Sequence, residues 1–260
     1  MTADDDVLFS RRGPILRITI NRPQRRNALT DRVFHLMTDA LVAAPKDGTT
    51  RAIVITGAGD RSFCAGADLT PGDTPFVPDY SQLSTPFANL LRAAVNCDLP
   101  LIARVNGYCF AGGMGIFGIC DLAVAADTAS FGLPEAKIGI FPMQVLAVLR
   151  DILPARVLQE LCYTAKPLSA IRMLELGTLN AVAPADKLDE AVDSLTNTIV
   201  GNSPAAIRRG KYALRAIAGM SFQQMMSFTE TALTSMIMTE DAKEGLRAFN
   251  ERRPPQWKDR

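Results

Sequence analysis

The chain has 260 residues, a length that fits one α/β domain with a helical appendage or two small domains. Hydrophobic residues make up 48% of the chain and charged residues 21%, which is ordinary for a globular protein with a sizeable core. The formal net charge is +1, so the composition gives no overall attraction to nucleic acid or an anionic membrane. Any anion-binding site must therefore come from a local group of residues and not from the overall charge.

The cysteine content favours a reducing compartment. The five cysteines are an odd number and no CxxC pair occurs, unlike a secreted disulfide scaffold. The N-terminal segment is acidic, and no basic stretch precedes an apolar run, so a signal peptide is not expected. Glycine or charged residues interrupt every apolar run before it reaches membrane-spanning length. We expect a soluble cytoplasmic protein with no membrane partner and no nucleic-acid partner.

Histidine is the most restrictive count, because His35 is the single one. A zinc site built from several histidines is excluded, and a Ser-His-Asp triad would have to use this residue. The surrounding segment predicts an amphipathic helix with Val33, Leu36, Met37 and Leu41 on a shared face. His35 is therefore expected on a helix surface or in packing.

The first half of the chain alternates predicted strands and helices. A polar loop covers 21–27, and Thr30 is a plausible N-cap for the helix that contains His35. Strands separated by helical segments indicate right-handed ββα or βαβ crossovers. The expected strands are 7–10, 15–20, 51–56, 101–105 and 121–126.

Residues 70–84 are rich in proline, glycine and polar residues and predict a long loop, either a substrate-facing lid or a surface insertion. After Pro142 the pattern is helical, and no repeat or low-complexity tract occurs. The expected helices are 145–153, 157–163, 170–176, 188–200, 205–218, 222–238 and 242–251.

Two glycine-containing turns, 62–69 and 106–115, each follow a predicted strand. Small residues allow a ligand to approach the backbone closely, and ligands of α/β sheets gather beyond the carboxyl ends of the strands. A helix is expected to begin near Gly112, where free N–H groups and the helix dipole would favour a developing negative charge. Either turn taken alone fits tight glycine packing better. Neither turn is a GxGxxG fingerprint, and no GxxxxGK[ST] motif occurs.

Taken together, ordered motifs over almost the whole chain resemble the crotonase (enoyl-CoA hydratase/isomerase) superfamily. Several motifs at the family's spacing are far more specific than any one of them. The matching segments are Asn21-Arg22-Pro23, Asn27-Ala28-Leu29, Cys64-Ala65-Gly66-Ala67-Asp68-Leu69, Asn106-Gly107-Tyr108, Ala111-Gly112-Gly113, Cys120-Asp121-Leu122-Ala123, Phe131-Gly132-Leu133-Pro134-Glu135 and the tail 248–254.

The resemblance implies an α/β fold, a crotonase/ClpP-like spiral of ββα units with a C-terminal helical trimerisation region. We expect the spiral core in 1–200 and the oligomerisation region in 201–260, assembled as a homotrimer or a dimer of trimers. The resemblance also implies an acyl-CoA substrate whose enolate is stabilised by the N–H groups of Ala67 and Gly112. No metal or redox cofactor is expected, since coenzyme A belongs to the substrate.

The coenzyme A site implied by the resemblance includes the loop around 22–26 and the stretch 65–70, with the tail completing the site of a neighbouring subunit. An aromatic ring can pack near the adenine, and a guanidinium group suits phosphate. Without the motif match, we would interpret the pairs Arg25-Arg26 and Arg252-Arg253 as a solvated basic surface. The expected substrate-binding residues are Arg22, Arg25, Arg26, Ala65, Ala67, Asp68, Leu69, Thr70, Gly112, Phe249 and Arg252.

The catalytic carboxylates depart from the family's hydratase pattern. Such hydratases carry two glutamates, and the first of these positions is Gly115 here, whereas Glu135 matches the second. Burial in an apolar turn would raise the pKa of Glu135 and suit it as a general acid/base. A structural glutamate at a helix start is the alternative. Asp68 is expected to cap a helix and Asp121 to open a strand.

A second departure follows Glu135, where hydratases of the family carry a glycine-rich segment. Here 141–145 reads FPMQV, and we expect Met143 and Val145 to pack near the acyl pocket.

Three functions stay open at this point. One base and an oxyanion hole suffice to move a double bond, so isomerisation of an enoyl-CoA with Glu135, Ala67 and Gly112 as catalytic residues is favoured. Hydration of a 2-enoyl-CoA is the close alternative, and an acyl-CoA-binding protein without turnover is the third. A ClpP-like protease is improbable because His35 is badly placed for a triad.

Overall fold

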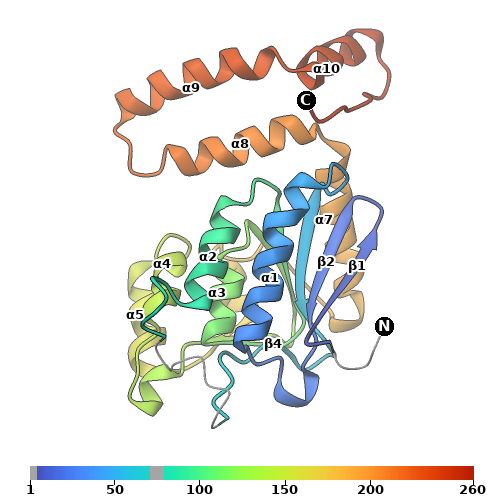
Figure 1. Cartoon of the computed structure of the whole chain (residues 1–260). Coiled ribbons are helices and arrows are strands. Elements are labelled where there is room, and N and C mark those ends of the chain that lie inside the picture. Colours follow the sequence, from blue (N-terminus) through green and yellow to red (C-terminus); the bar gives the residue numbers. More distant parts are fainter. Residues whose placement is uncertain (1–4, 71–78) are drawn as a thin grey trace.

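The computed structural model describes residues 5–70 and 79–260, which form two sheets surrounded by helices (Figure 1). The larger sheet has the strand order β1-β2-β3-β5-β7-β10. Its first pair is antiparallel, with Val7 opposite Ile20, and the remaining pairs are parallel. Its strands are β1 (Val7–Arg12), β2 (Ile15–Ile20), β3 (Ala52–Gly57), β5 (Leu101–Val105), β7 (Leu122–Ala126) and β10 (Ala181–Ala183).

The smaller sheet consists of the short strands that follow those of the larger one. Its order is β4-β6-β8-β9, so β3 leads to β4, β5 to β6 and β7 to β8. Each turn of the chain thus adds one strand to each sheet, which is the expected spiral of ββα units. The strands are β4 (Ser62–Cys64), β6 (Tyr108–Phe110), β8 (Ser130–Gly132) and β9 (Leu168–Ser169).

Seven α-helices cover the sheets in the described part of the first 201 residues. Thr30 caps the first helix by accepting a hydrogen bond from the Val33 amide, as expected. His35 is exposed on that helix, while Val33, Met37 and Leu41 are buried. The helices are α1 (Asp31–Ala43), α2 (Pro86–Asn96), α3 (Gly112–Gly118), α4 (Met143–Leu149), α5 (Ala155–Thr164), α6 (Ala170–Glu175) and α7 (Leu188–Gly201), with 3-10 turns η1 (Pro23–Arg25), η2 (Ala44–Lys46), η3 (Glu135–Ile138) and η4 (Ala185–Lys187).

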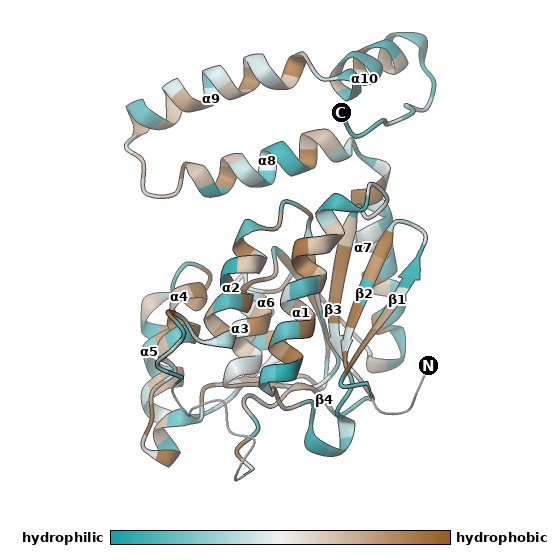
Figure 2. Ribbon diagram, viewed as in Figure 1, coloured by the Kyte–Doolittle hydropathy of each residue, from teal (hydrophilic) through white to brown (hydrophobic). Residues whose placement is uncertain are grey.

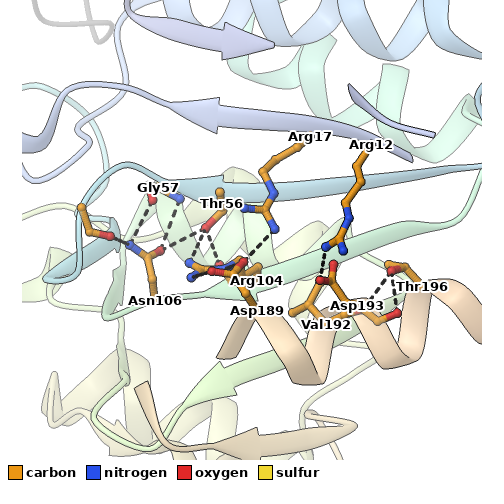
Figure 3. A network of polar contacts seen from close by, with 11 residues as sticks. Arg12, Arg17, Thr56, Gly57, Arg104, Asn106, Asp189, Val192, Asp193 and Thr196 are labelled. Carbon is orange, nitrogen blue, oxygen red and sulfur yellow. Dashed lines mark hydrogen bonds and ion pairs between the residues drawn. The ribbon is translucent and has the colours of Figure 1, made fainter. Parts of the chain in front are cut away.

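The apolar strands lie between two packed layers (Figure 2). The larger core joins α1, α2 and α3 to one face of the main sheet, and a smaller cluster packs α7 on the other face. Arginine–aspartate pairs hold α7 in place (Figure 3). Arg104 Nε and Nη2 both lie 2.9 Å from the Asp189 carboxylate, and Arg17 Nη2 lies 2.8 Å from it.

Three further helices lie beyond the two sheets, as Figure 1 shows. They are α8 (Pro204–Ala216), α9 (Phe222–Ile237) and α10 (Glu240–Glu251). Lys211 joins α8 to the core, because its Nζ lies 2.5 Å from both the Leu99 carbonyl and Asp121 Oδ2. By contrast, α9 has no buried residue in the single chain.

The expected strands and helices are all present, with boundaries shifted by a few residues. The largest difference is the helix expected over 145–153, which ends at Leu149 in the structure. Within the loop expected over 70–84, residues 71–78 lie outside the described residues. The described helices include none long and apolar enough to cross a membrane.

Candidate active site

The Ala67 amide lies where β4 leads into the chain segment beside Leu29. Leu29 forms a parallel bridge to Ala67, in which its N–H donates to the Gly66 carbonyl at 2.8 Å. Its carbonyl accepts from the Asp68 amide at 2.8 Å. These two bonds involve Gly66 and Asp68, the residues on either side of Ala67. Within residues 5–70 and 79–260 the Ala67 N–H itself has no hydrogen-bond acceptor.

The Gly112 amide opens α3 and lies close to Ala67. The Ala111 N–H donates to the Gly132 carbonyl at 2.9 Å, whereas the Gly112 N–H has no acceptor in the described parts of the chain. A Cβ atom on Gly112 would lie 3.7 Å from the Ala67 nitrogen. The structure thus places close together two backbone donors that have no acceptor in the described residues.

The backbone around the two amides has little freedom to change. Gly66 adopts a φ of +102°, and a Cβ there would lie 2.6 Å from the Ala111 Cβ and 3.3 Å from the Gly112 nitrogen. Ala111 itself has a φ of 51° and a ψ of −121°, a combination that side-chain-bearing residues rarely adopt. Any side chain at Gly66 would therefore push α3 away from Ala67.

Two buried asparagines fix the strand that leads to Ala67. Asn27 Nδ2 donates to the Ser62 carbonyl at 2.6 Å, and Asn106 Nδ2 donates to the same oxygen at 3.2 Å. Asn106 also bonds the N–H and the carbonyl of Gly57, as Figure 3 shows. Asn27 and Asn106, which belong to motifs recognised in the sequence, thus stabilise the turn between β3 and β4 through hydrogen bonds.

Glu135 is a buried carboxylate in the turn after β8. The hydrogen bond between Ala111 and Gly132 brings this turn beside the start of α3. The side chain is 8% exposed, and its Oε2 has no hydrogen-bond partner within the described residues. Loss of solvation raises the pKa of Glu135. A bare, poorly solvated carboxylate is the chemistry of a general base.

Gly115 lies one turn into α3, where the sequence lacks the second family carboxylate. A Cβ there would lie 2.6 Å from Phe87 Cζ and 3.4 Å from Val145 Cγ2. Two apolar side chains from α2 and α4 therefore cover this part of the helix. Phe87 was not predicted as a site residue.

Arg22 and Asp68 form an ion pair in the structure, with 2.9 Å between Arg22 Nη2 and Asp68 Oδ2. Arg22 Nη1 also donates to the Ala28 carbonyl at 2.7 Å. The expectation that Asp68 caps a helix is wrong: its Oδ1 accepts from the N–H and hydroxyl of Thr70, forming a local turn. The Thr70 hydrogen bond is the main cause that lowers the pKa of Asp68.

The other expected substrate-binding residues of the N-terminal half lie in the chain segments around Ala67. Arg25 and Arg26 are exposed on η1 and just after it, and Leu69 is 55% exposed. The Arg26 carbonyl accepts from the Ala65 amide at 3.1 Å and from the Ser62 hydroxyl at 2.9 Å. This basic loop is therefore held against the strand that carries the candidate oxyanion donors.

The two tail residues do not join this group within one chain. Phe249 is 82% exposed on α10, and Arg252 is exposed at its C-cap. Figure 1 places α10 at the end of the molecule opposite β4. Within one chain, the structure therefore does not bring these two residues to Ala67.

Of the two side chains expected near the acyl pocket, one is buried and one is exposed. Met143 is 71% exposed, so the expectation that it packs near the acyl pocket is wrong, whereas Val145 is buried as expected. Helix α5, which carries the buried Cys162, packs against the 3-10 turn that begins at Glu135. Burial raises the pKa of the Cys162 thiol, and the charge of Glu135 raises it further. Among the described residues, no three His, Cys, Asp or Glu side chains are grouped as metal ligands would be.

Two neighbouring backbone amides without acceptors in the described residues, together with a buried carboxylate on the turn after β8, are groups that an enzyme acting on carbonyl compounds can use. The sequence model of the family described as enoyl-CoA hydratase/isomerase matches residues 10–260. The chain therefore belongs to the enoyl-CoA hydratase/isomerase family and is an enzyme of that family.

Individual relatives agree with this assignment. The chain is 36% identical to a carnitinyl-CoA dehydratase of Salmonella enteritidis, over 98% of this chain and 99% of that protein. Its structure is similar to enoyl-CoA hydratases of Bacillus anthracis (TM-score 0.91, 27% identity, 98% of this chain and 100% of the other) and of Mycobacterium tuberculosis (TM-score 0.88, 34% identity, 98% and 99%).

Proposed function

We propose that this enzyme moves the double bond of an enoyl-CoA thioester, using Glu135 as its single acid/base and the Ala67 and Gly112 amides as oxyanion donors. The observation that carries the proposal is the bare, buried Glu135 oxygen on the turn beside two unused amides, with Gly115 in place of a second carboxylate. One base and one oxyanion hole are the groups that such a reaction needs.

In the proposed reaction, the Glu135 carboxylate removes a proton from C2 of a 3-enoyl thioester. The electron pair moves onto the thioester oxygen, and the Ala67 and Gly112 N–H groups stabilise the charge by about 3 kcal/mol each. The protonated Glu135 then delivers the proton to C4 as the electrons return, which leaves the double bond between C2 and C3. The raised pKa of Glu135 strengthens it as a base for this transfer.

The coenzyme A portion is proposed to lie along the basic loop and the segment after β4. Arg25 and Arg26 offer exposed guanidinium groups for phosphate, and Leu69 offers an exposed apolar surface. Arg22, Asp68 and Thr70 shape this segment through the bonds among themselves, while Ala65 and Gly112 allow close approach of the thioester. The proposal assigns no step to a metal or redox cofactor.

Hydration or dehydration is the second candidate function, and the printed names of the relatives favour it. A carnitinyl-CoA dehydratase and several enoyl-CoA hydratases share most of their length with this chain. Addition of water requires a group that orients it, and residue 115 supplies none. A third possibility, binding of acyl-CoA without turnover, is disfavoured by the bare Glu135 carboxylate.

The test compares wild type with Glu135→Gln on a panel of 3-enoyl-CoA and 2-enoyl-CoA compounds of increasing chain length. The proposal expects isomerisation by the wild type and a loss of about 100-fold to 10,000-fold in the variant. Glu160→Gln, an exposed carboxylate on α5, serves as the matched control and retains full activity. Efficient hydration that survives Glu135→Gln would reject the single-base mechanism, and binding without turnover would favour the third function.

We further propose that residues 201–260 form an oligomerisation region and that the chain assembles as a homotrimer or a dimer of trimers. The support is the apolar surface of α9, whose Phe222, Leu233 and Ile237 are all more than half exposed in the single chain. Assembly would also bring Phe249 and Arg252 to another subunit's coenzyme A site. A cytoplasmic location is proposed because all five cysteines are free thiols.

A further inference from the structure

The ring of Phe87 occupies the space into which a side chain at position 115 would project. Its Cζ lies 2.6 Å and its Cε1 3.5 Å from the Cβ position of Gly115. Gly115 lies one helical turn after Gly112, whose amide opens α3, so the Phe87 ring lies one turn along α3 from that amide.

The surroundings hold the ring in this place. Phe87 packs on Phe34 with ring centroids 5.1 Å apart, and Val145 approaches the same glycine from α4. Gln144 Nε2 donates to Thr85 Oγ1 at 2.6 Å, which joins the start of α4 to the N-cap of α2. Two helices are thus joined where their apolar side chains meet over Gly115.

We propose that Phe87 determines the reaction of this enzyme by keeping the α3 side of the site apolar and closed to water. A water molecule needs two or more polar partners to be held in a buried site, and Phe87, Val145 and Gly115 offer none through their side chains. Proton transfer within the substrate then proceeds at Glu135 without a competing nucleophile. This inference rests on the proposed acid/base role of Glu135.

The experiment uses the full chain and a matched pair at one position: Phe87→Gln, which places polar atoms over Gly115, and Phe87→Leu, which keeps this surface apolar. For each variant, hydration of 2-butenoyl-CoA and isomerisation of 3-hexenoyl-CoA are measured, and their ratio is compared with wild type. Phe87→Gln is expected to raise the hydration-to-isomerisation ratio at least about tenfold, because its amide supplies polar partners for a water molecule. Phe87→Leu, which retains most of the apolar volume, should stay within about twofold of wild type.

A second readout does not depend on turnover. Crystal structures of wild type and Phe87→Gln are compared, and an ordered water bound to the new amide over Gly115 is expected only in the variant. If Phe87→Gln fails to fold, Phe87→Asn carries both measurements.

Three outcomes separate the possibilities. An unchanged ratio in a folded Phe87→Gln or Phe87→Asn variant, with both rates reduced together, would show that Phe87 serves packing alone and overturn the inference. Unchanged rates in Glu135→Gln would reject the proposed base but leave the Phe87 test standing, since it compares two reactions in one variant. Turnover of neither compound by the wild type would reject both.

Discussion

Glu135 illustrates at the scale of one residue how a functional group can oppose the stability of the fold. Burial raises its pKa, so the folded chain binds a proton at pH values where the unfolded chain has released it. The free energy of unfolding therefore falls as pH rises from the ordinary glutamate pKa of 4.5 through the raised value. Above that window the fold contains a buried negative charge with an unpartnered oxygen.

Glu135→Gln is accordingly expected to stabilise the protein while abolishing activity. We expect a gain of roughly 1 kcal/mol in the free energy of unfolding near pH 8 and almost none near pH 4, where both forms are neutral. Urea denaturation at several pH values measures this difference. A variant equally stable or less stable than wild type at pH 8 would contradict the burial argument.

Gly66→Ala tests the geometry of the oxyanion donors. The new methyl group would lie 2.6 Å from the Ala111 Cβ, so Ala67 and Gly112 must move apart. The turnover rate is expected to fall about 100-fold or more, as for the loss of an oxyanion donor.

The matched control is Gly177→Ala, where φ is also positive at +75° but no atom lies within 4 Å of the new methyl. Both variants should lose about 1–2 kcal/mol of stability from the left-handed backbone. If both lost activity equally, backbone strain alone would explain the effect.

At this scale the roles assigned from the motifs stay predictions, and contacts between distant segments were missed. Gly115 showed that a carboxylate is missing, but nothing in the local sequence indicates that Phe87 fills the space. That contact depends on how α2 packs on α3. Met143 was misplaced for the same reason, since helical periodicity does not fix which face of a short helix meets the core.

At the scale of elements, Asp241 joins α10, the C-terminal tail and the start of α8. Its carboxylate is buried and accepts from the Ser203 hydroxyl at 2.8 Å and from the Lys258 and Asp259 amides at 2.7 and 3.1 Å. Asp241→Ala would leave these donors without a partner. We expect a loss of about 3 kcal/mol in the free energy of unfolding, measured by urea denaturation, and faster amide exchange in the tail.

Glu240→Ala is the control. Glu240 precedes Asp241 in the sequence, but its carboxylate is exposed and pairs only with Lys243 in the described part of the chain. Its effect should stay within about 0.5 kcal/mol. Equal losses in both variants would mean that Asp241 does not organise the tail.

Five of the six strands of the main sheet were predictable because they contain apolar runs bounded by glycine or polar residues, whereas the three-residue strand β10 was not predicted. The smaller sheet was not predicted. Its strands have two or three residues each, too few to show a periodic pattern, and they form because the spiral brings β4, β6 and β8 side by side. Tertiary structure determines these strands more than local propensity does.

At the scale of the whole molecule, the exposed apolar surface of α9 is the feature on which the proposed assembly rests. We expect sedimentation to give a mass that is a multiple of three of the 28.1 kDa chain. Leu233→Glu, in the exposed apolar surface of α9, should shift the protein toward monomers because a charge cannot be buried there without a partner. Leu83 is fully exposed in the segment before α2, so Leu83→Glu should leave the mass unchanged. A monomeric wild type would contradict the proposed assembly.

The left-handed conformation of Ala111 has a consequence for how the protein responds to heat. The hydrogen bond from Ala111 to Gly132 and the close approach of Gly66 fix this conformation as part of the folded sheets. The donor at Gly112 is consequently ordered during folding and needs no rearrangement when a thioester arrives. Activity should therefore be lost at the same temperature as the folded structure. No lower temperature is expected at which the enzyme is still folded but inactive.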